Sequence, residues 1–428
     1  MKDDMKILWL TAMPLPAKLK AESSAGPPTG GWISSMLNQL SALDCVSSIY
    51  IVGVHRKHAI EITNDGKFTH IRIPSRSGVF SYDHHLAKQL NQVISDYRPD
   101  IIDVQGVEFY LANSLLALSL DIPIVATLQG LVSECTRHYN AGIPTSDILK
   151  CLTLRNFIRP DGLFSGRRNY LRRGKNEIDC LKRLTYFTGR TEWDKAHTLA
   201  HNPNLKYYHC DRVLRAPFYQ HQWKLRDVKR FTIFTTQAKY PLKGLHVLLK
   251  AIQILKRDYP SVKLYIGGKD LLDKTGLIKR LSFSDYQKYI ASLLRKLHLE
   301  NNVFFTGLIS ADEVAQHLCR ANVFVIPSFI DNSPNALAEA QAIGTPVVAS
   351  LVGGIGSYVK DGATGLLYAH NEPLMLASKI RSIFGNDALA ILLSNEARLA
   401  AHTRHDPIKN ANTLVNVYNQ IINDYHHK

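Results

Sequence analysis

The chain has 428 residues, which is too long for one ordinary hydrophobic core and predicts two domains of roughly 200 residues each. Its 45% hydrophobic and 21% charged residues are typical of a folded globular protein and exclude a disordered chain. The formal net charge of +16 favours anionic partners, namely nucleic acid, an acidic membrane face or phosphorylated small molecules.

No apolar run approaches the roughly 18 residues of a membrane span. The opening sequence MKDDMKILWLTAMPLP does not read as a signal peptide, because its apolar stretch follows two acids and resembles a first strand. The six cysteines are scattered without a C-x-x-C pair, so we expect neither a disulfide framework nor a zinc site. These features predict a cytoplasmic protein.

The first half of the chain alternates short apolar runs with longer amphipathic ones. We expect buried strands at 6–12, 48–54, 100–106 and 122–130, which are rich in Ile and Val. The segment 81–97 places Leu86, Leu90 and Val93 on one helical face. Alternating strands and helices predict a parallel sheet covered by helices on both faces.

A second series of the same kind begins near residue 231. Its expected strands are 230–236, 262–268, 302–307, 322–328 and 345–350, and its expected helices are 244–259 and 310–321. Ser310 and Glu313 form a capping-box pattern at the second helix. We therefore predict two parallel-sheet α/β domains, over 1–218 and over 219–403, and a C-terminal helix at 404–428 returning to the first domain.

The segment 327–339 lies where a parallel sheet binds ligands, outside the carboxyl ends of its strands. Its turn leaves backbone N–H groups near a helix that starts around Pro334, and such groups attract phosphate or sugar oxygens. Asp331 and Glu339 flank this turn and could accept hydrogen bonds from ligand hydroxyls. The alternative is a turn-capping Asp331 and a solvated Glu339, but apolar neighbours around Glu339 favour a buried, partnered carboxylate.

The run PSFIDNSPNALAEAQAIGTPVVASLVGGIGSYVKDGATGLLY (327–368) resembles the signature of glycosyltransferase family 4 (glycosyl transferases group 1), of the GT-B fold. The two acids, the Ala-x-Ala-x-Gly-x-Pro-Val-Val run, the Gly-Gly pair and Asp-Gly-x-x-Gly all stand at the family spacing. The segment 240–252 also resembles the family's Lys-Gly helix start. The resemblance implies two Rossmann-like parallel-sheet domains facing a cleft, with 1–218 binding the acceptor and 219–403 binding the nucleotide-sugar.

The resemblance also implies roles for individual residues. Glu339 would bind the ribose, Asp331 the donor sugar and Lys243 the diphosphate, whose charge it would neutralise. Gly30 and Gly31 would let the backbone approach that diphosphate. The implied donor contacts further include Asn332, Ser333, Pro334 and Asn335.

Three positions depart from the family pattern. Asp331 replaces the usual Glu, Gln237 stands where an Arg is frequent, and Gln129 replaces a frequent His. Lys239 together with Lys243 could then clamp the diphosphate. Gln129 cannot act as a base but could orient the acceptor or the donor sugar. The resemblance implies retention of the anomeric configuration, no required metal or other cofactor, and a nucleotide-sugar such as a UDP- or GDP-sugar as donor.

The segment 150–190 carries eleven Lys or Arg and three acidic residues, a net charge of +8. Interleaved apolar residues suit peripheral docking on an anionic membrane, and the alternative is a solvated basic face. Arg190 could contact the donor or acceptor, although a local ion pair with Glu192 is favoured. His138 is a weaker candidate for an acceptor-side group.

These features predict a retaining, hexosyltransferase-type enzyme that moves a sugar onto a glycan or lipid-linked glycan in capsule, O-antigen or similar polysaccharide assembly. It would act in the cytoplasm or peripherally on the inner face of the cytoplasmic membrane. The alternative is a non-catalytic protein, or one binding nucleic acid or an anionic surface, on the same scaffold. We do not expect nucleic acid as a partner, because basic and aromatic residues do not interleave as in such modules.

Overall fold

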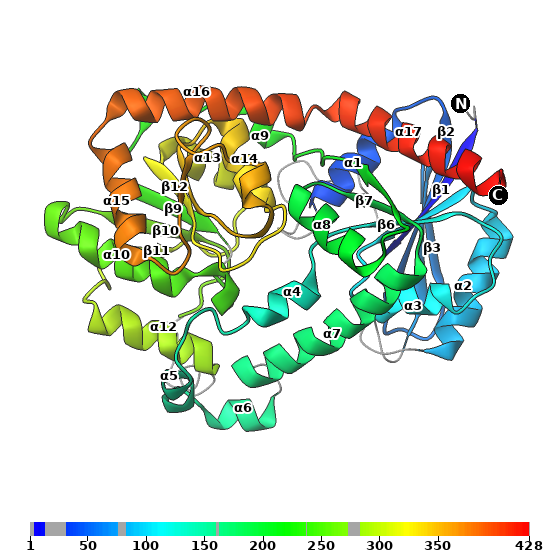
Figure 1. Ribbon diagram of the computed structural model, residues 1–428, viewed down its shortest axis with the longest axis horizontal. Coiled ribbons are helices and arrows are strands. Elements are labelled where there is room, and N and C mark those ends of the chain that lie inside the picture. Colours follow the sequence, from blue (N-terminus) through cyan, green and yellow to red (C-terminus); the bar gives the residue numbers. More distant parts are fainter. Residues whose placement is uncertain are drawn as a thin grey trace. The chain divides into compact units, whose positions relative to one another are not determined.

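The computed structural model describes residues 4–12, 31–75, 83–159, 162–236, 238–272 and 283–427 (Figure 1). The chain forms two compact units. Unit 1 comprises residues 1–133, 171–214 and 405–428, and unit 2 comprises residues 134–170 and 215–404.

Unit 1 is built on an eight-stranded sheet with the order β3-β4-β2-β1-β5-β6-β7-β8. Every pairing in it is parallel except β3 with β4, which form an antiparallel pair. Its strands are β1 (Met5–Thr11), β2 (Val46–His55), β3 (Glu61–Asp65), β4 (Phe68–Pro74), β5 (Ile101–Gln105), β6 (Ile124–Thr127), β7 (Tyr186–Gly189) and β8 (Lys206–His209).

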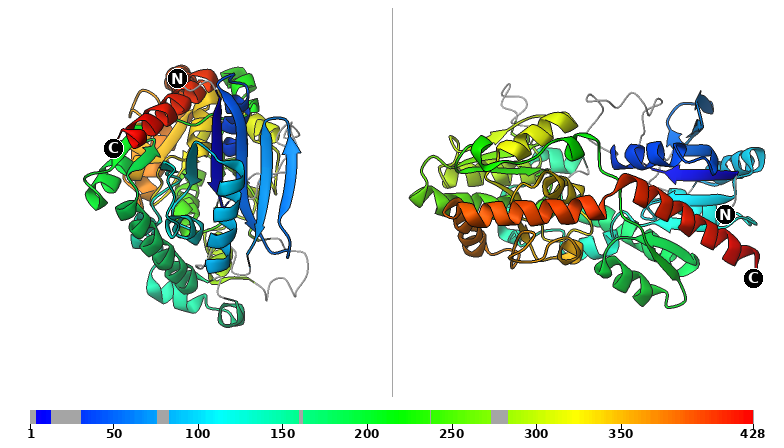
Figure 2. Two further views of the ribbon diagram at one scale, coloured as in Figure 1. Left: turned by 90° about the vertical axis from the view of Figure 1, so that its right-hand side faces the viewer. Right: turned by 90° about the horizontal axis from the view of Figure 1, so that it is seen from above.

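Helices cover both faces of this sheet because its central strands are apolar on both sides. One core joins the sheet to α1 (Gly31–Ser41) and α17 (Pro407–His426), and α17 lies along unit 1 in red in Figure 2. The other core joins it to the helices α2 (His84–Tyr97), α3 (Tyr110–Leu116), α7 (Leu163–Arg183) and α8 (Glu192–His201).

Unit 2 is built on a six-stranded, all-parallel sheet with the order β11-β10-β9-β12-β13-β14. Its strands are β9 (Thr232–Thr236), β10 (Lys263–Gly267), β11 (Val303–Phe305), β12 (Val323–Ile326), β13 (Val347–Ser350) and β14 (Leu366–Tyr368). β10 and β11 are added on one side of β9, and β12, β13 and β14 are added on its other side. The point of reversal between β9 and β12 is where doubly wound sheets bind ligands.

Helices also enclose this second sheet. α10 packs against α12 and α15, while α14 packs against α13 and α16. The helices of this unit and its connections are α4 (Val132–Arg137), α5 (Thr145–Lys150), α6 (Leu154–Ile158), α9 (Pro217–Gln220), α10 (Leu245–Asp258), α12 (Asp285–Lys296), α13 (Ala311–Arg320), α14 (Asn335–Ile343), α15 (Pro373–Phe384) and α16 (Asp387–Arg404), with 3-10 turns η2 (Leu225–Asp227), η3 (Pro241–Lys243) and η4 (Gly353–Ser357).

The segment 134–170, which the sequence suggested was part of a 1–218 domain, packs with unit 2. His246 is buried and its Nε2 lies 2.8 Å from the carbonyl oxygen of Ala141. Asp285 accepts a hydrogen bond from the backbone N–H of Leu163 at 2.7 Å. These contacts come from α10 and α12, so the segment is anchored to helices that follow it in sequence by about a hundred residues or more.

The fold class predicted from the sequence is confirmed, since both units are parallel-sheet α/β structures. The expected strands and helices recur with bounds shifted by a few residues, and the Ser310 capping box is present. The antiparallel β3–β4 pair was not foreseen: β3 is polar and mostly exposed and lacks a buried-strand pattern, whereas β4 is largely buried and was missed. No helix in the described ranges is long and apolar enough to cross a membrane.

Candidate functional site

A small pocket of about 30 Å³ opens in unit 2 where β9 and β12 end. This is the switch point of the sheet, where the helices that follow the two strands diverge to opposite faces. The residues lining it are Thr235, Thr236, Lys243, Ile326, Pro327, Ser328, Asp331, Pro334, Asn335 and Ala336. The structure therefore brings together Lys243, Asp331, Pro334 and Asn335, which the sequence placed in the donor site.

Lys243 and Asp331 form an ion pair in this pocket. The Lys243 Nζ lies 2.7 Å from Asp331 Oδ2, and both side chains are largely buried. Burial alone would lower the pKa of Lys243, but the Asp331 carboxylate outweighs it and raises that pKa above its usual range. The pocket thus holds a permanent cation next to a carboxylate.

Glycines position both members of the pair. Gly244 follows Lys243 with φ of +69°, and a Cβ there would collide with the carbonyl oxygen of Pro327. Gly353 has φ of +50°, and a Cβ there would collide with the carbonyl oxygen of Asp331. The backbone N–H of Gly354 donates to that same oxygen at 2.9 Å, so the Gly-Gly pair of the sequence signature packs directly on the Asp331 turn.

Glu339 lies on α14 and is buried, as its apolar neighbours indicated. Arg215 donates two hydrogen bonds to its Oε1, from Nη2 at 2.8 Å and from Nε at 3.2 Å. Burial raises the pKa of Glu339, and Arg215 partly offsets this effect. Both bonds go to one oxygen, which leaves Oε2 available for a ligand.

The remaining predicted donor residues are distributed around the start of α14. The helix begins at Asn335, so Pro334 is the N-cap residue rather than the first helical residue, and no side chain caps the helix. Asn332 and Ser333 are buried, and the Ser333 hydroxyl has no hydrogen-bond partner within the described ranges.

Of the four other predicted donor residues, the two that the structure describes, Lys239 and Gly31, are not among the lining residues of this pocket. Lys239 is exposed and is not among the residues that line the pocket, and its joint action with Lys243 on a diphosphate stays a prediction. Gly30 and Gln237 lie outside the described residues. Gly31 is the first residue of α1 in unit 1.

A second polar cluster lies at the carboxyl ends of β5, β6 and β7 in unit 1. Gln129 donates to Gln105 Oε1 at 3.2 Å and accepts from Arg212 Nη2 at 2.7 Å. The Arg212 guanidinium stacks 3.9 Å from the centre of the Trp32 ring, and Arg190 lies 5.8 Å from the same ring. Gln129 is therefore fixed in orientation by two partners.

The ion pair that we expected between Arg190 and Glu192 is wrong. Arg190 is buried and donates to the carbonyl oxygen of Leu128, whereas Glu192 begins α8 as an exposed residue. The turn between them sends the two side chains to different environments. Arg190 instead lines a small pocket of unit 1 together with Trp32, Thr188 and Arg212.

His138 lies in unit 2 and not in the N-terminal unit where an acceptor-side group was expected. The residue is exposed overall, but its ring is partly buried. This partial burial, and the nearby His370, lower the pKa of His138. In that state it is mainly neutral at pH 7.

Sequence reasoning missed Arg212 and Arg215, which contact Gln129 and Glu339 respectively. Both lie in DRVLRAPFYQ (211–220), which shows neither a helical nor a strand periodicity. The sequence therefore indicated only that this stretch leads to a domain boundary. The available signal was that two polar side chains withdrawn from solvent, the half-buried Gln129 and the buried Glu339, required partners.

Comparison with known families identifies the segment that carries this pocket. Residues 218–405 match the family described as Glycosyl transferases group 1. By sequence, this segment is similar to group 1 glycosyltransferase domains. It contains Lys243, Asp331 and Glu339, and it ends where α17 begins.

Curated relatives match over a third to a half of the chain. The D-inositol 3-phosphate glycosyltransferase of a Nocardioides species is 32% identical over 154 residues, which cover 35% of this chain and 32% of the relative. A glycogen synthase of Mycobacterium tuberculosis is 30% identical over 36% of this chain and 34% of its own length. The putative glycosyltransferase YtcC of Bacillus subtilis is 29% identical over 48% of each chain. The chain thus spans about a third to a half of the length of these relatives.

Solved structures match over nearly the whole chain. Sucrose-phosphate synthase from Thermosynechococcus elongatus superposes with a TM-score of 0.69 at 16% identity, covering 98% of this chain and all of that one. HepE of Anabaena, solved with UDP-glucose, gives 0.62 at 16% identity over 99% and 100% of the two chains. WaaG, a glycosyltransferase involved in lipopolysaccharide biosynthesis, gives 0.61 at 14% identity over 95% and 98%. This likeness shows the fold, that of GT-B glycosyltransferases.

Proposed function

We propose that the chain is a retaining glycosyltransferase that moves a sugar from a nucleotide-sugar, a UDP- or GDP-sugar, to a hydroxyl of a glycan or lipid-linked glycan acceptor. The observation that carries the proposal is the buried Lys243–Asp331 pair at the switch point of unit 2, within the group 1 segment. The solved neighbour HepE binds UDP-glucose, which agrees with a donor of this class.

The chemistry requires a cation where the leaving diphosphate gathers charge. Lys243 is held as a cation by Asp331, and a bound diphosphate would compete with that carboxylate for the ammonium group. Displacing Lys243 from Asp331 would free Asp331 oxygens to accept hydrogen bonds from donor-sugar hydroxyls. The same pair thus couples phosphate binding to sugar binding.

Glu339 suits the ribose. Its Oε1 is fixed by Arg215, so Oε2 can accept a hydrogen bond from a ribose hydroxyl without a reorientation of the side chain. The backbone at Ser333 and Asn335, at the uncapped start of α14, would contact sugar or phosphate oxygens. Because the proposed leaving group is stabilised by fixed charges, attack from its own face by the acceptor hydroxyl, assisted by the leaving phosphate, accounts for retention.

In unit 1, Gln129 and Arg190 are proposed to orient the acceptor. Gln129 is fixed by Gln105 and Arg212, and it can exchange hydrogen bonds but not accept a proton. Gly31, at the start of α1, is proposed as a backbone contact of the diphosphate. His138 is kept as a weaker acceptor-side candidate.

The experiment is a donor panel. Purified protein is incubated with UDP-, GDP-, ADP- and dTDP-sugars, and release of the nucleoside diphosphate and the anomer of the freed sugar are followed. We expect one donor to be turned over, with a loss of about 100-fold or more in Lys243→Ala and Glu339→Ala. The matched control Glu396→Ala, an exposed carboxylate on α16, should match the unaltered protein. Binding of a donor without turnover with any acceptor would support the non-catalytic alternative instead.

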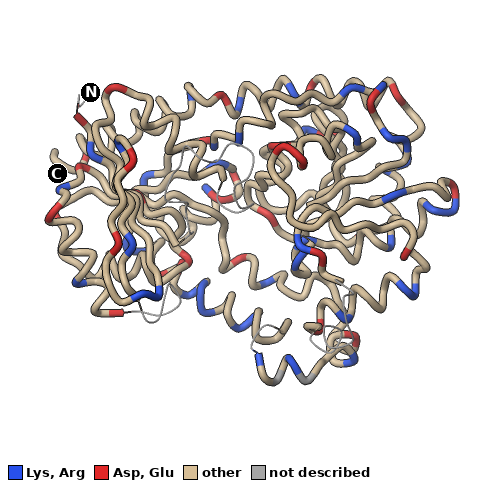
Figure 3. The backbone as a smooth tube through the Cα atoms, turned by 180° about the vertical axis from the view of Figure 1, so that it is seen from behind, with Lys and Arg blue, Asp and Glu red and all other residues tan. Residues whose placement is uncertain are grey.

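We also propose that the protein docks on anionic membrane, where a lipid-linked acceptor would be found, at the inner face of the cytoplasmic membrane. One face of α7 exposes two apolar and four basic side chains, and its blue segments are visible in Figure 3. These side chains are Phe164, Arg167, Arg168, Leu171, Arg172 and Lys175. A face with this composition suits anionic headgroups and the outer acyl region.

The docking proposal is tested by co-sedimentation with vesicles. Arg167, Arg168, Arg172 and Lys175 are replaced together by Gln, and binding to vesicles with anionic lipid is compared with binding to neutral vesicles. We expect the substituted protein to lose anionic-vesicle binding while donor hydrolysis persists. Unchanged vesicle binding would contradict the proposal.

A further inference from the structure

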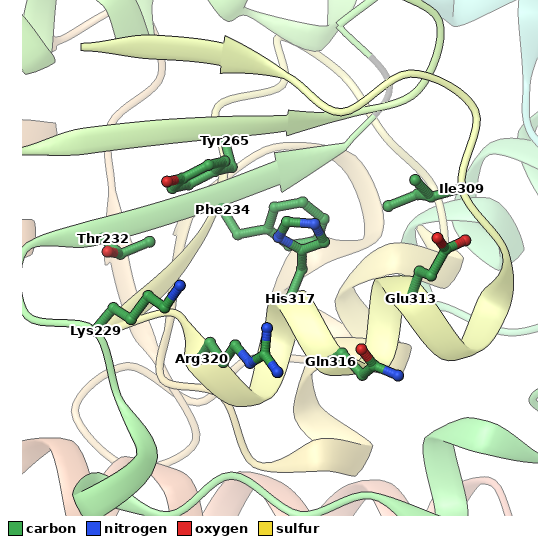
Figure 4. A pocket seen from close by; sticks show the side chains of 9 residues that line it. All are labelled: Lys229, Thr232, Phe234, Tyr265, Ile309, Glu313, Gln316, His317 and Arg320. Carbon is green, nitrogen blue, oxygen red and sulfur yellow. The ribbon is translucent and has the colours of Figure 1, made fainter.

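A larger pocket of about 210 Å³ lies elsewhere in unit 2, alongside α13 (Figure 4). It is lined by Lys229, Thr232, Phe234, Tyr265, Ile309, Glu313, Gln316, His317 and Arg320. Thr232 is the first residue of β9, so the pocket reaches the amino end of the strand, whereas Lys243 and Asp331 follow the carboxyl ends. None of its lining residues is shared with the donor pocket.

One wall of this pocket is aromatic and packed. Phe234 is fully buried and stacks on His317, with ring centroids 5.1 Å apart and an interplanar angle of 13°. Tyr265 lies 5.7 Å from His317 and stacks on Phe304 at 5.3 Å. Tyr265 and His317 are tilted by 44° to each other, so the wall is angled, and because each ring is held by another it is a preformed aromatic surface for a sugar or a base.

Two cations stand at one end of the pocket, as Figure 4 shows. The backbone N–H of Lys229 donates to the carbonyl oxygen of Arg320 at 2.9 Å, which holds the two residues next to each other. In the described part of the chain, neither side chain forms an ion pair or hydrogen bond. The carboxylate in the lining, Glu313, is engaged with Ser310 in the capping box at the far end of the pocket.

Two adjacent cations without an acid repel each other, and an anion between them would relieve that repulsion. The alternative is that Arg320 only stabilises the negative end of α13, where cations are favourable. That role accounts for neither Lys229 nor the concave aromatic wall. Burial, with Arg320 and Lys229 next, lowers the pKa of His317, so its ring is neutral near pH 7 and can form part of an apolar surface.

We propose that this pocket binds a phosphomonoester carried on a ring, which is either a sugar phosphate or a nucleoside monophosphate. The phosphate would lie between Lys229 and Arg320, with the guanidinium offering two parallel N–H donors. The ring would lie against Tyr265 and His317. The Thr232 hydroxyl lies in the same lining and would supply a further polar contact, whereas the Gln316 amide nitrogen already donates to Asp312 at 2.6 Å.

The proposal is tested by calorimetric titration of the full chain with glucose 6-phosphate and with AMP, and with inorganic phosphate and glucose as partial ligands. We expect one of the two esters to bind more tightly than inorganic phosphate or glucose. The ester that binds shows whether the pocket takes a sugar phosphate or a nucleoside monophosphate. Lys229→Ala and Arg320→Ala should each weaken binding about tenfold or more, because a charge-assisted contact is lost. Tyr265→Ala should weaken ester binding but leave the affinity for inorganic phosphate unchanged.

Two controls separate this site from the donor pocket and from nonspecific charge effects. Arg257→Ala removes an exposed arginine of α10 outside the pocket and should leave binding unchanged. Lys243→Ala should also leave ester binding unchanged, whether or not the protein proves to be a glycosyltransferase. The proposal is overturned if neither ester binds the unaltered chain, or if Lys243→Ala abolishes binding while Lys229→Ala and Arg320→Ala do not. Lys229 and Arg320 are exposed, so these variants are expected to fold.

Discussion

Arg215 and Glu339 form a mostly buried pair whose two members depend on each other. The Glu339 side chain is 11% exposed and the Arg215 side chain 22%. We expect Arg215→Ala to lower the free energy of unfolding by about 2 kcal/mol, because it leaves a buried carboxylate without its cation. The expected cost is below that of a fully buried pair, since solvent screens Arg215 in part.

This cost is measured by urea unfolding, with Arg257→Ala as the control for loss of an exposed arginine. Glu339→Gln should cost less than Arg215→Ala, because the amide oxygen can still accept from Arg215 and the cation that loses its carboxylate is more exposed to solvent than the carboxylate is. Equal stabilities for Arg215→Ala and the unaltered chain would mean that the pair contributes nothing to the fold.

Glu177 gives the chain a predictable dependence on pH. It is buried and accepts hydrogen bonds from the backbone N–H groups of Val132 and Ser133 and from the Ser133 hydroxyl. Burial raises its pKa to about 7, and nearby Glu108, itself paired with Arg173, also raises it. Unfolding returns the carboxyl to its usual pKa near 4.5, so between these two values the folded state holds a proton that the unfolded state has lost.

It follows that the contribution of Glu177 to stability is greatest below about pH 4.5, falls as the pH rises to about 7, and is constant above that. The shift corresponds to roughly 3 kcal/mol at most. We expect the free energy of unfolding of Glu177→Gln to vary less with pH across this window than that of the unaltered chain. Chemical unfolding of both proteins at pH 5, 6, 7 and 8 checks this prediction. If the two free energies of unfolding change in parallel with pH, the prediction is contradicted.

At the scale of elements, the turn from η3 into α10 depends on Gly244. Its φ is +69°, and a Cβ there would collide with the Pro327 carbonyl, so Gly244→Ala combines backbone strain with a steric clash. Gly362 has a similar φ of +75°, but a Cβ there would meet nothing within 4 Å. Gly362→Ala therefore isolates the strain alone.

We expect Gly362→Ala to cost about 1 kcal/mol and Gly244→Ala clearly more, because Pro327 or α10 must move. The free energies of unfolding of the two variants are compared in urea. Gly244→Ala should also weaken donor binding, since it displaces Lys243. Equal costs for the two variants would show that the turn adjusts freely.

The strands and helices that surround the donor pocket were predictable from the sequence because their signals are local. Apolar runs marked β9, β12 and β13, and the Ser310 capping box marked the start of α13. The Lys243–Asp331 contact was accessible only through the family pattern, since 88 positions separate the two residues.

Long-range packing was not predictable in the same way. Segment 134–170 forms short helices and mixes apolar with basic residues, and nothing in its sequence indicates that His246 and Asp285 of unit 2 anchor it. The same limit applies to the pocket along α13. Phe234, Tyr265 and His317 come from three separate elements, and only the fold brings them into one wall.

At the scale of the whole molecule, the end of the chain completes the first unit. α17 packs in one core with α1 and the sheet of unit 1. The Tyr418 hydroxyl accepts from Trp9 Nε1 at 3.0 Å and donates to Asp103 Oδ2 at 2.5 Å. Burial raises the pKa of Asp103 to about 6, and the bond from Tyr418 opposes that rise.

Deletion of residues 405–428 should therefore destabilise unit 1 and spare unit 2. We expect hydrogen exchange to show lost amide protection in α1 and β1, whose apolar side chains α17 covers, with protection in β12 and β13 retained.

Since the deleted chain can aggregate, Tyr418→Phe serves as the milder variant: it keeps the ring and removes both hydrogen bonds. Tyr418→Phe should lower the free energy of unfolding by about 1–3 kcal/mol, because the buried Trp9 N–H and Asp103 carboxylate lose their shared partner. The loss of amide protection should be confined to unit 1. Equal loss of protection in both units would mean that they unfold as one cooperative body, and α17 would then stabilise the whole chain rather than the unit it packs against.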